Sequence, residues 1–123
     1  MTRSLKELPD DQLAVLSLLL SGGRSYDEIA RLSGADSGAV RARAHTAAAQ
    51  LVESNRPPDA ATRALIVDYL LGVQSHADRV RSCYLLAGSP PDREWATRLS
   101  RALAPLTKVP LPVIPGEGPL ALN

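Results

Sequence analysis

The sequence predicts an all-α protein, and three observations support this expectation. In six segments of the 123-residue chain, apolar residues recur every three or four positions, which is the spacing of one helix face. Gly, Pro and residues that favour helix N-caps separate these segments. No segment shows a sustained alternation of apolar and polar residues, the pattern expected of a half-buried strand.

The first predicted helix covers residues 8–21. Pro9 suits its first position, because the ring fixes a helical φ and the missing N–H would have no partner there. Two acidic residues follow and complement the positive end of the helix dipole. Gly22 and Gly23 are expected to end the helix. Its apolar stripe comprises Leu13, Leu16 and Leu20.

The second predicted helix covers residues 25–33. Ser25 and Glu28 have the spacing of a capping box, in which each side chain accepts a hydrogen bond from the other residue's backbone N–H. Gly34 is expected to end the helix, since glycine adopts the left-handed conformation at low cost.

The third predicted helix begins after Asp36, a natural N-cap, and ends near Val52. Its buried stripe is expected to comprise Val40, Ala44, Ala47 and Leu51. Three polar side chains fall off this stripe and are expected to face away from the core: Arg41, Arg43 and His45.

The second half is predicted to form a smaller helical subdomain at residues 59–104. Residues 55–58 contain paired prolines, which cannot continue a helix and which stiffen a linker, so they separate this subdomain from residues 8–54. Residues 105–123 are predicted to be an extended or disordered Pro-rich tail. The three helices of the subdomain are expected at residues 59–71, 76–87 and 89–104.

Two helices of this half carry residues that bear on partners. Val80, Cys83, Tyr84 and either Leu86 or Leu85 are expected to face inward from the helix at 76–87. Trp95 is expected to begin a core stripe in the last helix, or else to be an exposed anchor for a partner. In the second case, Tyr84, Leu86 and Trp95 would line an exposed apolar groove, which would favour a protein partner.

Composition excludes several classes of function. The single cysteine, Cys83, rules out an intrachain disulfide, and no cluster of Cys and His has zinc spacing, so neither a metal nor a cofactor is expected. The sequence contains no phosphate-binding glycine loop, no nucleophile elbow and no HExxH motif, so we do not expect an enzyme. The longest apolar stretch, residues 13–20, is far below the ~20 residues of a transmembrane helix, and residues 1–7 lack a signal sequence, so a cytoplasmic location without membrane contact is expected.

The charge is small and evenly distributed. The net charge is +1, and residues 1–56 carry seven basic and seven acidic residues against seven and six in residues 57–123. Neither half is therefore a polybasic nucleic-acid patch. DNA binding would depend on a few well-placed side chains.

An ordered set of motifs in the first half resembles region four of bacterial sigma factors, especially the extracytoplasmic-function type. The resemblance covers residues 8–51 and is carried by residues 8–12, 25–30, Gly34 and 38–45. It implies a helix-turn-helix whose recognition helix, from about Ser37 to Val52, lies in the major groove of a promoter. The residues that it implies for base or phosphate contact on this helix are Ser37, Gly38, Arg41, Arg43 and His45, with Arg24 and Ser25 touching the DNA backbone.

The chain also departs from this family. Ala39 stands where the family often has Thr, and Thr46 and Ala48 stand where it usually has Arg. Each lost phosphate contact lowers affinity for DNA. No segment supplies region two, which binds polymerase and melts the promoter, so the chain is not expected to be a complete sigma factor.

A fainter resemblance links residues 59–104 to zinc-associated anti-sigma domains. Family spacing would place the ligands at Leu85, Ser89 and Asp92, and none of these is His or Cys. The resemblance therefore implies a metal-free domain that binds a sigma factor.

Two functional hypotheses follow from these patterns. The first is a small bacterial transcription regulator that binds duplex DNA. A positive stripe on the surface along Arg24, Arg41 and Arg43 would favour this hypothesis. The alternative is a protein-interaction module that keeps the helix-turn-helix but binds a sigma factor, an anti-sigma factor or RNA polymerase without binding DNA. The small aliphatic core also allows a homodimer.

Overall fold

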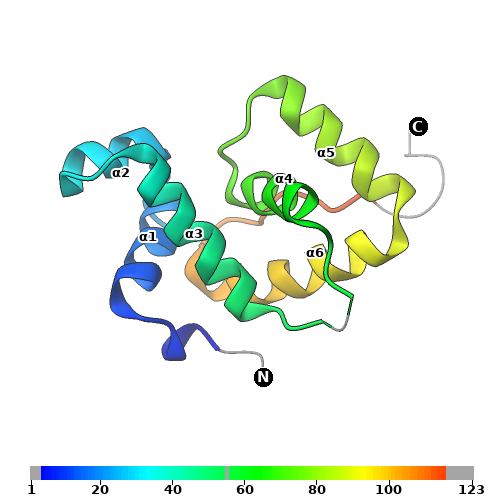
Figure 1. The fold of residues 1–123 in the computed structure, drawn as a ribbon, viewed down its shortest axis with the longest axis horizontal. Helices are drawn as coiled ribbons and strands as arrows, with labels where there is room; N and C mark the ends of the chain where they lie inside the picture. The colour runs from blue at the N-terminus through cyan, green and yellow to red at the C-terminus, as the bar shows by residue number, and fades with distance from the viewer. Residues whose placement is uncertain (1–3, 55, 116–123) are drawn as a thin grey trace.

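The computed structural model describes residues 4–54 and 56–115. This part of the chain contains six α-helices, two short 3-10 helices and no strand (Figure 1). The all-α prediction is therefore confirmed. The α-helices are α1 (Asp10–Leu20), α2 (Tyr26–Ser33), α3 (Ser37–Leu51), α4 (Ala60–Leu71), α5 (His76–Gly88) and α6 (Pro90–Leu103), and the 3-10 helices are η1 (Leu5–Glu7) and η2 (Ala104–Leu106).

Helices α2, α3 and α4 begin at the side chains that were expected to cap them. Ser25 accepts a hydrogen bond from the Glu28 N–H at 3.2 Å, and Glu28 accepts one from the Ser25 N–H at 3.0 Å, which completes the capping box. Asp36 caps α3, and Asp59 caps α4. These local bonds satisfy backbone donors that have no partner inside the helix.

Helix ends differ from the predictions in small ways. Gly34 and Gly72 end α2 and α4 with φ of 73° and 72°, the left-handed conformation that favours glycine. Pro9 is the N-cap of α1 and not its first residue, so that prediction is wrong by one position. Ser89 precedes the first residue of α6, Pro90, without forming a side-chain cap bond.

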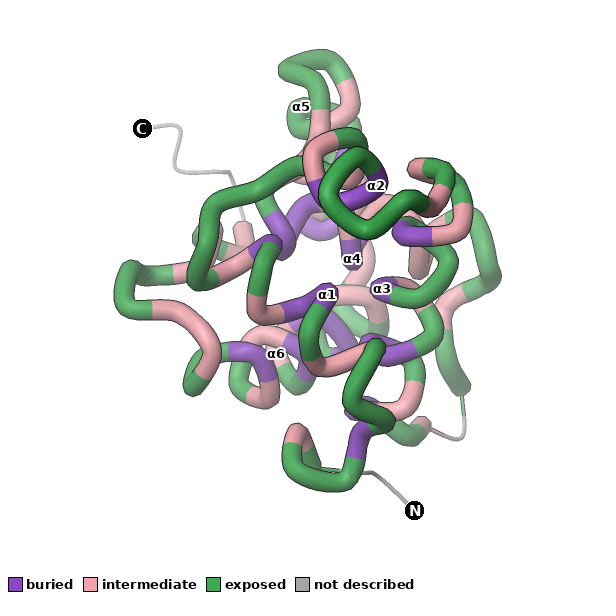
Figure 2. The backbone as a smooth tube through the Cα atoms, turned by 90° about the vertical axis from the view of Figure 1, so that its left-hand side faces the viewer, coloured by how far each residue is buried: buried purple, intermediate pink, exposed green. Residues whose placement is uncertain are grey.

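One hydrophobic cluster joins the two halves of the chain. Helices α1, α2 and α3 lie on one side of the molecule, and α4, α5 and α6 lie on the other (Figure 1). Helix α3 contacts α1, α2, α4 and α6, and η2 contacts α1. The buried stretches of α1, α3, α4 and α6 therefore meet in the interior (Figure 2). The residues predicted as two subdomains share this cluster.

The predicted inward face of α5 is partly wrong. Leu86 is buried and Cys83 is half-buried, but Val80 and Tyr84 are exposed, Tyr84 to 71%. Helix α5 packs mainly against α4 and α6, so only the narrow face with Leu86 and Ser82 is covered. Four positions around a helix cannot all reach one narrow interface.

The exposed apolar groove expected around Tyr84, Leu86 and Trp95 does not form in the described part of the chain. Leu86 is fully buried and Trp95 is only 4% exposed, since both belong to the hydrophobic cluster. Tyr84 alone of the three is available to a partner. The core role expected for Trp95 is confirmed.

The start of the Pro-rich tail packs against the core. Residues 107–115 form no helix, and Leu111 and Ile114 pack against the hydrophobic cluster. The Tyr69 hydroxyl donates a hydrogen bond to the Val113 carbonyl. The rest of the predicted tail, residues 116–123, lies outside the described residues.

Candidate functional site

Side chains from three helices meet at Asp68 of α4. The Tyr26 hydroxyl of α2 donates to Asp68 Oδ1 at 2.7 Å. Arg41 Nη2 of α3 donates to Oδ2 at 2.9 Å, and His45 Nε2 lies 2.8 Å from Oδ1. We call Tyr26, Arg41, His45 and Asp68 the Asp68 cluster. An ionised carboxylate only accepts hydrogen bonds, so Nε2 of His45 carries the proton in this contact.

The Asp68 cluster favours an ionised carboxyl at Asp68 and a neutral phenol at Tyr26. Burial raises the pKa of the Asp68 carboxyl, but hydrogen bonds from His45, Tyr26 and Arg41 outweigh burial and hold this pKa below its usual range. Burial and the adjacent Asp68 carboxylate raise the pKa of the Tyr26 phenol. At neutral pH the carboxylate is thus ionised and the phenol is neutral. Donor and acceptor match, which is the arrangement that stabilises a buried polar network.

Helix α4 contacts α3 at two of the residues that were expected to meet DNA. Asp68 holds Arg41 and His45 at one end of this contact. Further along, the two helices enclose a pocket of about 280 Å³. Its lining consists of His45, Thr46, Ala49, Ala60, Arg63, Ala64, Val67 and Trp95. Arg41 and His45 therefore make contacts within the chain, whereas Gly38, Arg43 and Thr46 of the same helix are exposed.

Any contact of Arg41 or His45 with DNA would compete with these bonds inside the chain. A base or phosphate contact by Arg41 would have to replace its bond to Asp68 Oδ2, and one by His45 would have to replace its contact with Oδ1.

The other cations expected at DNA also have carboxylate partners. Arg43 Nε lies 3.7 Å from Asp11 Oδ2, and Arg24 Nη1 lies 3.7 Å from Glu28 Oε2. All four side chains are exposed, and ion pairs of this kind stabilise little and open readily. Arg24 and Arg43 are thus accessible to solvent, whereas His45 is largely covered.

The structure brings together only some of the expected DNA contacts. Four of them line one shallow pocket at the start of α3: Ser25, Ser37, Gly38 and Arg41. Arg24 and Arg43 are not part of its lining, and His45 lines the pocket beside α4. The expected positive stripe along Arg24, Arg41 and Arg43 is interrupted by the carboxylates that pair with them.

Asp68 was not identified from the sequence as a site residue. A signal was present, since Asp68 is the single charged residue in the apolar stretch from residue 64 to residue 71. A charge in such a stretch requires a partner when the helix is buried. Sequence spacing could not identify that partner, because Arg41 and Tyr26 are distant in the chain.

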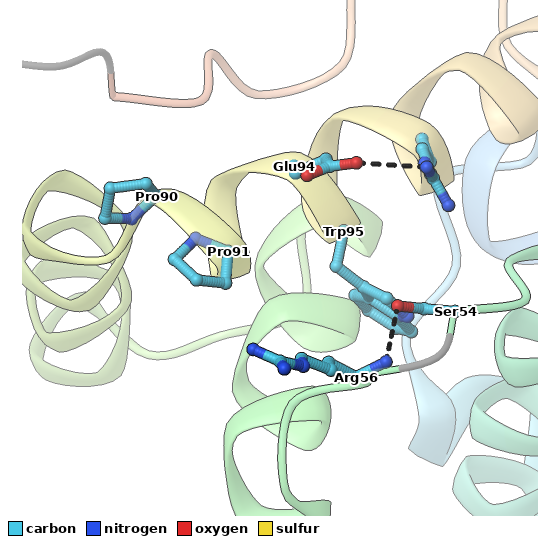
Figure 3. A pocket seen from close by; sticks show the side chains of 7 residues that line it. Ser54, Arg56, Pro90, Pro91, Glu94 and Trp95 are labelled. Carbon is cyan, nitrogen blue, oxygen red and sulfur yellow. Dashed lines mark hydrogen bonds and ion pairs between the residues drawn. The ribbon is translucent and has the colours of Figure 1, made fainter.

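A second cleft lies between the linker and α6 (Figure 3). It has a volume of about 340 Å³, and Pro90, Pro91 and Trp95 line it together with Ser54 and Arg56. On the α6 side of the cleft, Arg98 donates to Glu94 Oε1 at 3.0 Å, one turn away on the same helix. The cleft therefore offers one carboxylate, which is already paired, and no arrangement of acid and base.

The described residues form neither a cluster of metal ligands nor a helix that could span a membrane. No three side chains of His, Cys, Asp or Glu in residues 4–54 and 56–115 come together so that they could hold a metal ion. In the same ranges, none of the helices has the length and apolar character needed to span a membrane.

Comparison with known proteins gave no family to which the chain can be assigned. No family model, curated protein or solved structure matches it significantly. The contacts of the chain itself, and above all the Asp68 cluster, therefore carry the functional inference.

Proposed function

We propose that this chain is a protein-interaction module of the transcription machinery. It retains a helix-turn-helix similar to sigma region four and binds a sigma factor, an anti-sigma factor or RNA polymerase. The observation that carries the proposal is the engagement of Arg41 and His45, two of the expected DNA contacts, by Asp68 of α4. With these two side chains held within the chain, α3 would serve as a scaffold for other surfaces.

Electrostatics supports the same proposal. Asp68 neutralises the Arg41 guanidinium, which is 50% exposed and the most central cation of the expected reading face. The carboxylate lies beside Arg41 and would repel DNA phosphates that approach this side chain. With a net charge of +1, the chain has no general attraction to DNA that would offset this repulsion.

A small transcription regulator that binds duplex DNA is the second candidate. It is supported by the exposed first turn of α3 with Gly38, and by the exposed side chains of Arg24 and Arg43. These groups could reach phosphates from the rim of the helix-turn-helix. In this function, Arg41 and His45 would exchange their bonds to Asp68 for contacts with DNA.

Fluorescence anisotropy on random duplex DNA separates the two candidates. We expect the wild-type chain to show no salt-sensitive binding between about 50 and 200 mM salt, the range in which phosphate contacts are apparent. Arg43→Ala should then leave the signal unchanged. Purified sigma factor, anti-sigma factor and RNA polymerase are then titrated into the chain in separate experiments. We expect the chain to form a complex with at least one of them.

The proposal is contradicted if the wild-type chain binds DNA with a clear salt slope and Arg41→Ala weakens that binding about tenfold or more, the loss expected for a base contact. Arg81→Ala on α5 is the matched control, since it removes the same charge from an exposed helix face away from α3. Equal losses in Arg41→Ala and Arg81→Ala would indicate a general charge effect and no reading helix. Failure to bind any of the three proteins would also overturn the proposal.

A further inference from the structure

The outer face of α5 is an apolar stripe that no element of residues 4–54 and 56–115 covers. Val80 and Tyr84 lie one helical turn apart and are 40% and 71% exposed. Helix α5 lies at the edge of the molecule, beyond α4 (Figure 1), and packs mainly on α4 and α6 through its opposite face. Exposed tyrosines of this kind are enriched among the residues that dominate protein interfaces.

Basic side chains flank this stripe. Arg79 and Arg81 are exposed on either side of Val80, and His76 is exposed at the start of the helix. The one acidic residue of α5, Asp78, lies 3.7 Å from Arg81. Arg79 forms no ion pair within the described ranges. The face thus combines an apolar centre with a positive rim.

We propose that this face is the docking surface for an acidic amphipathic helix of the partner, an inference that rests on the protein-interaction function proposed above. Apolar residues one turn apart on the incoming helix pack against Val80 and Tyr84. Glu or Asp residues beside them pair with Arg79 and Arg81. Charge complementarity of this kind speeds association and selects the partner.

The same charges argue against a second copy of this chain as the occupant. Two α5 faces packed together would bring Arg79 and Arg81 of one copy against those of the other. Like charges at a contact disfavour it. Duplex DNA is also a poorer match, because its charged phosphates do not pack against the apolar centre formed by Val80 and Tyr84.

Two synthetic peptides test the inference. The first is a helical peptide of about 16 residues, roughly four turns, with Leu at positions one turn apart and Glu on both flanks. The second has Lys in place of each Glu. We expect the acidic peptide to bind the full chain, with amide chemical-shift changes centred on α5, and we expect the Lys peptide not to bind. Tyr84→Ala and Arg81→Ala should each weaken the acidic peptide about tenfold, within the range of single interface residues.

Charge reversal gives the sharper result. The double variant Arg79→Glu, Arg81→Glu should lose the acidic peptide and gain the Lys peptide. Arg31→Glu, a reversal at an exposed position of α2 in the other half of the chain, is the matched control and should change neither affinity. Both variants alter exposed side chains, so circular dichroism should report an unchanged fold.

Four outcomes would overturn the inference. The acidic peptide does not bind, or it binds wild type and Tyr84→Ala equally. Sedimentation shows a dimer that Tyr84→Ala disrupts. Duplex DNA changes the chemical shifts of the α5 amides. If the sigma factor, anti-sigma factor or polymerase binds wild type and Tyr84→Ala equally, the α5 surface is wrong while the proposed function stands.

Discussion

Trp95→Ala is expected to lower the free energy of unfolding by about 3–5 kcal/mol, the usual range for removing a large aromatic side chain from a core. Trp95 is 4% exposed and belongs to the hydrophobic cluster that α3, α4 and α6 share. Its side chain borders the cleft at the linker on one side and the pocket between α3 and α4 on the other. The alanine variant would remove the side chain that separates these two spaces and leave its neighbours in the cluster without that packing.

Urea denaturation followed by circular dichroism measures this loss. Tyr84→Ala is the matched control, since it removes an aromatic side chain that is exposed, and surface changes of this kind usually stay within about 0.5 kcal/mol. Trp95→Ala should also loosen both halves of the chain together, because both contribute to the damaged cluster. A loss of less than about 1 kcal/mol, or amide exchange that rises only in α4 to α6, would contradict the shared core.

The helices could be predicted from sequence because their signals are local. The capping box of Ser25 and Glu28, the N-caps Asp36 and Asp59, and the left-handed Gly34 each act within one turn of the helix that they bound. Such bonds form whatever the rest of the chain does. Helix boundaries consequently agree with the structure to within a few residues.

The orientation of side chains between helices depends on long-range packing. Arg41 and His45 do leave the apolar stripe of α3, as expected, but they face α4 and bond to Asp68. Tyr84 fits the helical spacing of a core position, yet α5 has too little cover to bury it. Periodicity identifies which residues share a face. It does not identify what covers that face.

Asp68→Ala is expected to lower the free energy of unfolding by about 2–3 kcal/mol, since loss of one partner leaves buried polar groups unsatisfied. The substitution removes the acceptor of Tyr26, Arg41 and His45 together. Half of the Arg41 side chain is exposed, so water can hydrate it in the variant. The loss therefore stays below that expected for a fully buried pair. Urea denaturation measures the loss, with Asp11→Ala as control because Asp11 forms only an exposed ion pair with Arg43.

The contribution of Asp68 is expected to depend on pH in a direction set by its lowered pKa. A carboxyl whose pKa is lower in the folded chain stabilises that chain fully above its unfolded pKa of about 3.9, and this stabilisation is lost as pH falls through the folded value. Asp68→Asn keeps the size of the side chain and an acceptor oxygen but removes the charge. Its deficit against wild type, measured by urea denaturation, should therefore be large at about pH 7 and should shrink as pH falls below about 4. A deficit that stays the same at about pH 2–3 would show that the shape of the side chain holds α4 on α3, and not the ionised carboxylate that the three donors favour.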